Sequence, residues 1–234
     1  MTRKLHIVST RCLDSFNFQK LNEKEFTFSS VDFIRKKVDI PVNISKLSFH
    51  KDIVITSKMG VISFLQIAGM KGIDLQKCSI YCLSHGTRKY AKNSGLKIVK
   101  TASNASNLAE EILNDPDVKA VTYICSNKRR NELSERLIKA EVIVQEVIAY
   151  RTDLTPVGIE QPYDAILFFS PSAVESFLKL NPLKPAACFC LGETTADYAL
   201  KHGYVDIHIP PIPTEESLLE TVVNHFSIYP THAK

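Results

Sequence analysis

The chain has 234 residues, a formal net charge of +4 and 44% hydrophobic residues. This length allows one large domain or two small ones, and the composition is that of an ordinary globular protein. The longest apolar runs reach about five to eight residues, far short of the roughly 20 that span a membrane. The small positive charge is scattered along the sequence, so neither a nucleic-acid partner nor a membrane partner is expected.

The six cysteines stand at positions 12, 78, 82, 125, 188 and 190. None of them forms a CxxC pair, and four lie in apolar runs that are typical of buried strands. We interpret them as reduced core thiols of a cytoplasmic protein rather than as a metal or redox site. The N-terminus lacks the apolar core of a signal peptide, which agrees with that location.

The hydrophobic pattern predicts strands that alternate with helices of about ten residues. The N-terminal part predicts strand Leu5–Ser9, helix Phe16–Leu21 and strand Phe26–Ile34. The middle part predicts strand Ile53–Thr56, helix Gly60–Ala68, strand Ser79–Leu83, helix Thr87–Asn93, strand Leu96–Val99, helix Ser106–Leu113, strand Ala120–Cys125, helix Arg130–Ala140 and strand Val142–Tyr150. The C-terminal part predicts strand Ala165–Phe169, helix Ala173–Lys179, strand Ala187–Leu191, helix Thr194–Lys201, strand Val205–Ile209 and helix Glu215–His225.

This alternation predicts an α/β fold with parallel sheets that are covered by helices on both faces. The middle of the chain supplies five strands, and the two ends supply two and three. We therefore expect two similar lobes, each a five-stranded parallel sheet flanked by helices. One lobe is continuous over residues 44–148, and the other is built from residues 1–36 and 153–234. Residues 37–43 and 149–152 are the expected linkers, and these two crossings indicate a two-segment hinge.

One motif occurs twice in the chain. The segments IVITSKMGVISFL and ILFFSPSAVESFL align so that Ser57 matches Ser170. Each is an apolar run, a polar turn and then apolar residues at helical spacing, which indicates a buried strand that leads into a helix. A second match follows each copy and pairs Thr87 with Thr195. Two ordered matches favour two copies of one α/β unit, with a cleft between similar lobes.

Polar turns follow the carboxyl ends of most predicted strands, which is where ligands bind in open parallel sheets. Free backbone N–H groups at the helix starts favour negative charge at such a position. Capping of the helices alone explains the hydroxyl groups of these turns, and capping combined with a ligand contact is the alternative. The candidate ligand-binding residues are Thr10, Arg11, Ser57, Thr87, Ser170, Ser172, Thr195 and Thr214.

Three further features have two interpretations each. Tyr150 stands where the chain leaves the middle lobe, and its phenol either donates a proton or packs against the hinge. The basic run Lys128–Arg130 is either a solvated helix start or a contact for an anionic ligand. His85 is alone in its turn and is either a surface histidine or a catalytic base.

Several motifs that carry chemistry are missing from the sequence. No GxGxxG fingerprint, Walker loop, HExxH motif, GxSxG elbow or paired His/Cys ligand set is present. We therefore expect no cofactor and no metal, which leaves cofactor-free chemistry or simple binding as the function.

Taken together, these residues resemble the uroporphyrinogen-III synthase family over nearly the whole chain. The resemblance rests on Ser9-Thr10-Arg11, Ile55-Thr56-Ser57 with Val61, Phe168 to Val174, Leu191 to Ala196, Tyr150-Arg151-Thr152, and Pro213-Thr214 before Leu218-Leu219. It implies two α/β lobes joined by a two-stranded linker. It also implies conversion of the linear tetrapyrrole hydroxymethylbilane into uroporphyrinogen III, with loss of water and inversion of the last pyrrole ring.

The resemblance also implies roles for particular residues. Tyr150 is similar to the tyrosine proposed in this family to help the terminal hydroxyl leave. The residues similar to positions that line the family's cleft are Ser57, Thr87, Ser170, Ser172, Thr195 and Thr214. We expect hydroxymethylbilane as the substrate and a monomeric protein. The alternative from another class is a two-lobed binding protein that closes on a small polyanionic ligand without catalysis.

Overall fold

The computed structural model describes residues 3–13, 26–84 and 86–228 of the chain. The predicted helix Phe16–Leu21 and the candidate base His85 lie outside these described residues. Among the helices of the described part, none combines the length and the apolar character that crossing a membrane requires.

The chain divides into two compact units, which are described separately. The first unit combines residues 1–35 with residues 153–234, and the second unit comprises residues 36–152. The described part of each unit contains one sheet, and β1 (Leu5–Ser9) and β4 (Asp52–Ile55) therefore lie in different sheets. The two boundaries between the units fall within β3 (Ile34–Val38) and β8 (Ile143–Leu154).

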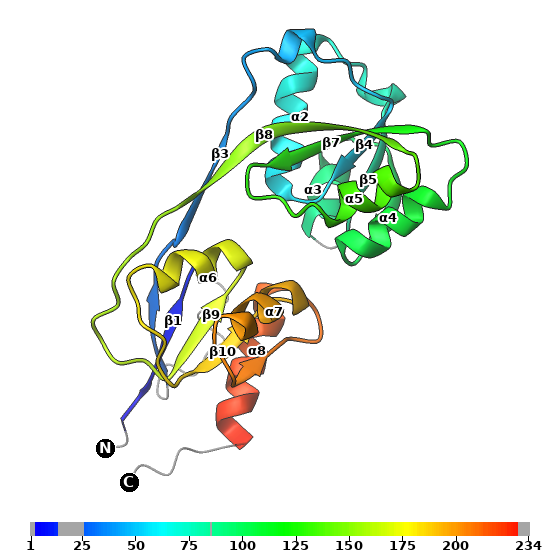
Figure 1. Cartoon of the computed structure of the whole chain (residues 1–234). Helices are drawn as coiled ribbons and strands as arrows, with labels where there is room; N and C mark the ends of the chain where they lie inside the picture. Colours follow the sequence, from blue (N-terminus) through cyan, green and yellow to red (C-terminus); the bar gives the residue numbers. More distant parts are fainter. Residues whose placement is uncertain (1–2, 14–25, 85, 229–234) are drawn as a thin grey trace. The chain divides into compact units, whose positions relative to one another are not determined.

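The sheet of the first unit has five strands in the order β11-β10-β9-β1-β2 (Figure 1). All four of its strand pairings are parallel. Its strands are β1 (Leu5–Ser9), β2 (Phe26–Ser30), β9 (Ala165–Phe168), β10 (Ala187–Cys190) and β11 (Ile207–His208). The helices in the described part of this unit are α6 (Pro171–Leu178), α7 (Glu193–Lys201) and α8 (Glu215–Ile228).

Both faces of this first sheet are buried, and β9 shows how the sequence achieves this. Side chains alternate between the faces of a strand. Ile166 and Phe168 pack in one core with residues of α6 and α7, whereas Leu167 packs in the other core with residues of α8. All four residues of β9 are buried. Because both faces of β9 are buried, its sequence is a continuous apolar run instead of an alternating one.

The sheet of the second unit has six strands in the order β3-β8-β7-β4-β5-β6 (Figure 1). The pairings from β8 to β6 are parallel. Besides β3 and β8, its strands are β4 (Asp52–Ile55), β5 (Ser79–Leu83), β6 (Ile98–Ala102) and β7 (Ala120–Ser126). Its helices are α2 (Lys58–Lys71), α3 (Gly86–Asn93), α4 (Ala105–Leu113), α5 (Glu132–Lys139) and the 3₁₀ turns η1 (Ile44–Lys46) and η2 (Leu75–Lys77).

The second sheet is also covered on both faces. Ile53 and Ile55 of β4 share one core with residues of α2 and α3, whereas Val54 shares the other core with residues of α4 and α5. The predicted fold class, parallel sheets flanked by helices, is therefore confirmed.

The duplicated motif occupies the same place in both sheets. When the first sheet is read from β2 and the second from β8, the orders are β2-β1-β9-β10-β11 and β8-β7-β4-β5-β6. The two strands that open the motif, β9 and β4, are third in these orders. The strands that follow them in the chain, β10 and β5, are fourth. The two copies are thus equivalent in topology as well as in sequence.

The expectation of two five-stranded sheets is wrong by one strand. The predicted strand Phe26–Ile34 is interrupted after β2, and the buried Phe33 precedes the separate strand β3. β3 lies beside β8, and just beyond it the backbone N–H of Asp39 donates to the carbonyl of Ala149 at 3.0 Å. Its basic residues are exposed, as is typical of an edge strand. Residues 149–152, expected as a linker, are part of β8.

Candidate functional site

Tyr150 and Ser57 form a hydroxyl pair in the second unit. Tyr150 lies in β8, in register with Ser126 at the end of β7, and is 5% exposed. Its hydroxyl oxygen is 2.7 Å from the Oγ atom of Ser57. The backbone N–H of Gly60 donates to the same Oγ atom at 3.0 Å. The phenol is therefore connected through Ser57 to the first turn of helix α2.

Local sequence explains why Ser57 stands at this point. It follows β4 in an extended conformation (φ −151°, ψ 158°) and caps α2 with its side chain. A Cβ atom on Gly60 would lie 2.9 Å from the Cγ2 atom of Ile55 and 3.3 Å from the carbonyl oxygen of Ile124. Only glycine lets the first turn of α2 approach β4 and β7 this closely.

The environment of Tyr150 keeps its phenol protonated. Burial raises the pKa of Tyr150 above its ordinary value, and the hydrogen bond with Ser57 opposes this increase without cancelling it. A phenol ordinarily ionises near pH 10. At neutral pH the group therefore carries its proton and is a hydrogen-bond donor, which is the state that a general acid needs.

A second tyrosine lies near this pair and was not singled out from the sequence. The hydroxyl of Tyr123, in β7, is 3.2 Å from the Oγ1 atom of Thr56, the residue before Ser57. Burial raises the pKa of Tyr123 to about 12, although the hydrogen bond with Thr56 opposes this shift. The sequence feature that could have identified Tyr123 is a tyrosine within the apolar run of a predicted strand. Tyr123 is the natural comparison for Tyr150.

The segment after β7 is held by hydrogen bonds to the end of β8. The Oδ1 atom of Asn127 accepts a hydrogen bond from the backbone N–H of Thr152 at 2.8 Å. The Oγ atom of Ser126 lies 3.3 Å from the Oγ1 atom of Thr152. These contacts fix the course of the chain beside Tyr150.

The basic run that follows β7 is partly neutralised within the unit. Arg129 forms an ion pair with Glu146, whose other carboxylate oxygen accepts a hydrogen bond from Ser134 at 2.6 Å. The Arg129 side chain is 24% exposed. Helix α5 begins at Glu132, so the run precedes the helix instead of opening it. Neither of the two interpretations of this run describes Arg129, because its guanidinium is paired with Glu146 within the fold.

The remaining candidate of the second unit, Thr87, is half-buried in the first turn of α3. That helix follows β5, the strand next to β4. Thr87 thus lies beyond the carboxyl end of its strand, as expected. The contact between Ser57 and Tyr150 joins two of the candidates directly, and it could not be read from residues so far apart in the sequence.

In the first unit, Thr10 and Arg11 follow β1 and differ in their surroundings. Thr10 is 1% exposed, and its hydroxyl donates to the carbonyl of Leu167 at 2.7 Å, so its contact holds β1 to β9. Arg11 is exposed, forms an ion pair with Glu215 at the start of α8, and lies 4.0 Å above the ring of Phe169. Of these two residues, Arg11 has the accessible charge that an anionic ligand would meet.

The other candidates of the first unit lie at helix starts. Ser170 caps α6 and accepts a hydrogen bond from the backbone N–H of Ala173 at 3.3 Å. Ser172 is half-buried in the same turn, and Thr195 is 4% exposed in the first turn of α7. Thr214 is exposed and accepts a hydrogen bond from the backbone N–H of Ser217 at 3.2 Å in the first turn of α8.

Comparison with known proteins decides the family. The family model described as uroporphyrinogen-III synthase HemD matches residues 28–220. This chain belongs to the uroporphyrinogen-III synthase family. The match covers most of both units and includes Tyr150, Ser57 and the duplicated motif.

Solved structures support the fold of this family member. The uroporphyrinogen-III synthetase from Helicobacter pylori is 19% identical, with a TM-score of 0.66, over 94% of this chain and 99% of that chain. A mutant uroporphyrinogen III synthase from Thermus thermophilus is 16% identical, with a TM-score of 0.71, over 96% of this chain and 99% of that chain. The comparison with curated proteins finds no match. The coverage shows that the whole fold is shared, although few residues are identical.

Proposed function

We propose that this member of the uroporphyrinogen-III synthase family closes hydroxymethylbilane to uroporphyrinogen III with Tyr150 as the proton donor to the departing hydroxyl. The reaction loses water and inverts the last pyrrole ring. The family match over residues 28–220 carries the assignment of the reaction. The hydroxyl pair between Tyr150 and Ser57 supports the assignment of the donor.

The chemistry explains why one positioned proton donor is enough. When the terminal hydroxyl of the substrate accepts a proton, it leaves as water and an electrophilic azafulvenium cation remains. The added proton is balanced by the one that is released when the ring closes. The substituted carbon of the last ring attacks this centre and forms a spiro intermediate, which reopens and closes with that ring inverted. Uncatalysed closure gives the uninverted isomer. The protein must therefore hold the substrate in one folded geometry, and orientation supplies the larger part of catalysis.

The connection from α2 to Tyr150 suits proton donation. The N–H of Gly60 donates to Ser57, and in one of the two possible directions the Ser57 hydroxyl donates to the Tyr150 oxygen. In that arrangement the phenol proton is free to be given to the substrate. The phenolate that forms is then stabilised by Ser57 and by the positive end of the α2 dipole.

Binding of the substrate requires groups that favour its eight carboxylates. The helices α2, α6, α7 and α8 begin at the polar turns described above, and their first N–H groups favour negative charge. Arg11 adds an exposed guanidinium, which is suited to bidentate contacts with carboxylates. We infer that Arg11, Ser57, Ser172 and Thr214 contact the substrate. The buried Thr10 and Thr195 support the turns that carry such contacts.

The proposed reaction has a direct test. The purified protein is incubated with freshly generated hydroxymethylbilane, and the oxidised porphyrin products are separated by isomer. We expect the inverted type III isomer in excess over a control without protein. If only the uninverted type I isomer forms while the protein binds the substrate, a binding protein without catalysis is the correct interpretation.

We also infer that the protein works in the reducing environment of the cytoplasm. All six thiols are free, and five of them are buried. Disulfides are rare in that compartment, and buried thiols persist there. Thiol titration of the unfolded, unreduced protein is expected to count six groups, and a lower count would contradict this location.

A further inference from the structure

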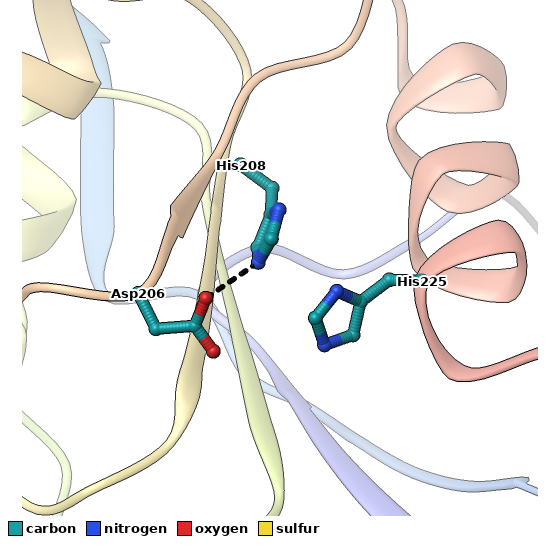
Figure 2. A group of neighbouring side chains, drawn as sticks. All are labelled: Asp206, His208 and His225. Carbon is teal, nitrogen blue, oxygen red and sulfur yellow. Dashed lines mark hydrogen bonds and ion pairs between the residues drawn. The ribbon is translucent and has the colours of Figure 1, made fainter. Parts of the chain in front are cut away.

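Three side chains that the reaction does not use lie together in the first unit. Among the described residues, Asp206, His208 and His225 form the one group of three or more such residues that could hold a metal ion, and their ligand atoms all lie within 4.8 Å of one another (Figure 2). His208 ends the edge strand β11, and His225 lies near the end of helix α8. The group therefore joins the edge strand of the sheet to the last helix, which follows this strand in the chain.

The fold positions Asp206 and His208 on one side of the edge strand. They are two residues apart, so an extended chain turns both side chains to the same side. The Nε2 atom of His208 lies 2.7 Å from the Oδ1 atom of Asp206. The backbone carbonyl of Asp206 accepts a hydrogen bond from the N–H of Cys188 at 2.8 Å, which fixes this residue to β10.

A buried phenylalanine holds the two imidazole rings. The ring of His208 stacks on Phe189 with centroids 4.9 Å apart, and the ring of His225 meets Phe189 edge-on at 5.5 Å. The centroids of the two imidazoles are only 4.3 Å apart. Phe189 has no exposed surface, so the site rests on a rigid part of the core. Figure 2 shows that His225 extends from α8 toward His208 and Asp206.

We propose that Asp206, His208 and His225 bind one divalent transition-metal ion of the zinc class. Imidazole nitrogen and carboxylate oxygen are ligands that this class of ion prefers. The side chains of His208 and Asp206 are 28% and 53% exposed, which gives an ion access from solvent. In a tetrahedral zinc site the ligand atoms lie roughly 3.3 Å apart, so small side-chain rotations would complete the geometry. Three protein ligands leave the fourth position for water.

The bound ion would act as a clamp between β11 and α8. Asp206 and His208 belong to the edge of the sheet, whereas His225 belongs to the last helix. An ion that binds the folded state stabilises it by mass action. The site takes no part in the proposed reaction, because none of its ligands belongs to the polar turns assigned to the substrate. This inference therefore stands or falls independently of the proposed function.

The test uses Zn²⁺ alone with the full-length, metal-free protein. Calorimetric titration is expected to show one saturable site, and the midpoint of thermal unfolding is expected to rise by several degrees with Zn²⁺. The variants Asp206→Asn, His208→Gln and His225→Gln should each weaken binding at least tenfold. The matched control is His202→Gln, since His202 is an exposed histidine of the same unit that stacks on Tyr198. It should bind Zn²⁺ like the unchanged protein.

A titration with a second metal ion, Co²⁺, distinguishes binding at this site from binding to a cysteine. Co²⁺ bound by nitrogen and oxygen absorbs weakly in the visible range, whereas a thiolate ligand adds a strong near-ultraviolet band. We expect the first kind of spectrum, which excludes the exposed Cys12. Binding that does not saturate, that shows the thiolate band, or that persists in all three ligand variants would overturn the proposal. Three independent variants, each checked by circular dichroism, keep the result decisive if one of them fails to fold.

Discussion

The hydroxyl oxygens of Tyr150 and Ser57 lie 2.7 Å apart, although the residues are separated by 93 positions in the sequence. Ser57 also caps helix α2, so one side chain connects a helix start to a buried phenol. At the equivalent place of the first unit, the described residues form no such pair. In the first unit, the residue that corresponds to Tyr150 is Ser30. Ser30 is in register with the last residue of β1, just as Tyr150 is in register with the last residue of the equivalent strand β7. The two units therefore share the scaffold but not the tyrosine.

The first prediction concerns this tyrosine. Tyr150→Phe should lower turnover by about 10- to 100-fold, at the low end of what a general acid contributes or somewhat below it, because an azafulvene is resonance-stabilised and forms readily. The product should remain the type III isomer. The matched control is Tyr123→Phe, which removes the phenol hydroxyl of the neighbouring strand β7. Steady-state kinetics with isomer analysis check both. Full activity of Tyr150→Phe would show that another group donates the proton.

The second prediction separates capping from catalysis at Ser57. Ser57→Ala removes both the cap of α2 and the partner of Tyr150, so the unfolding free energy should fall by about 1 kcal/mol and turnover should fall as well. Asn104→Ala is the control, because Asn104 caps α4 through the N–H of Asn107 at 2.8 Å. It should lose similar stability and keep its turnover.

The same variant tests the coupling of the two hydroxyls. If Ser57 acts through the phenol, the losses of turnover in Ser57→Ala and Tyr150→Phe should not add in the double variant. Additive losses would mean that the two hydroxyls act separately, and the proposed connection from α2 to the phenol would then be wrong.

The sequence predicted the fold far better than it predicted the contacts of the site. The duplicated motif is a local pattern of apolar and polar residues, and it led directly to the equivalent strands β4 and β9. The extra strand β3 was missed because its basic residues are typical of a linker as well as of an exposed edge strand. Residues 35–37 form a strand because they lie beside β8, which is more than 100 positions away in the chain.

Side-chain pairs between distant segments were beyond the reach of the sequence. Tyr150 and Ser57 were each singled out, but nothing in the sequence places one against the other. The group of Asp206, His208 and His225 was missed altogether, because no local spacing relates α8 to β11. Only the packing of both elements around Phe189 brings these three side chains together.

The third prediction tests the close approach of α2 to the sheet. Gly60→Ala places a Cβ atom 2.9 Å from Ile55 and 3.3 Å from a backbone carbonyl, so the helix start must move. We expect a loss of about 1–3 kcal/mol in unfolding free energy. Gly69→Ala is the control in the same helix, where the new methyl meets nothing within 4 Å. It should gain up to about 1 kcal/mol from helix propensity. Chemical denaturation measures both values, and equal effects would contradict this account.

The fourth prediction concerns stability in alkali. Burial raises the pKa of Tyr123 to about 12, whereas a phenol in the unfolded chain ionises near pH 10. Between these values the unfolded state releases its proton and the folded state keeps it, so the unfolding free energy must fall as the pH rises. Tyr123→Phe should make this decline less steep. Denaturation curves measured between pH 9 and about 12 test the slope, and an unchanged slope would show that Tyr123 ionises without unfolding.

The fifth prediction separates the proposed clamp from the proposed reaction. The cyclisation moves protons and carbon–carbon bonds without a change of oxidation state, and Tyr150 supplies the proton that the leaving hydroxyl needs. Chelation followed by dialysis should therefore leave turnover unchanged. The same treatment should lower the midpoint of thermal unfolding if the protein carried an ion on Asp206, His208 and His225, because the ion binds only the folded arrangement of β11 and α8. Parallel measurements of turnover and unfolding on treated, untreated and Zn²⁺-restored samples make the comparison. If chelation abolishes turnover and one ion restores it in the His225→Gln variant as well, the reaction requires a metal held elsewhere, and the cofactor-free mechanism is wrong.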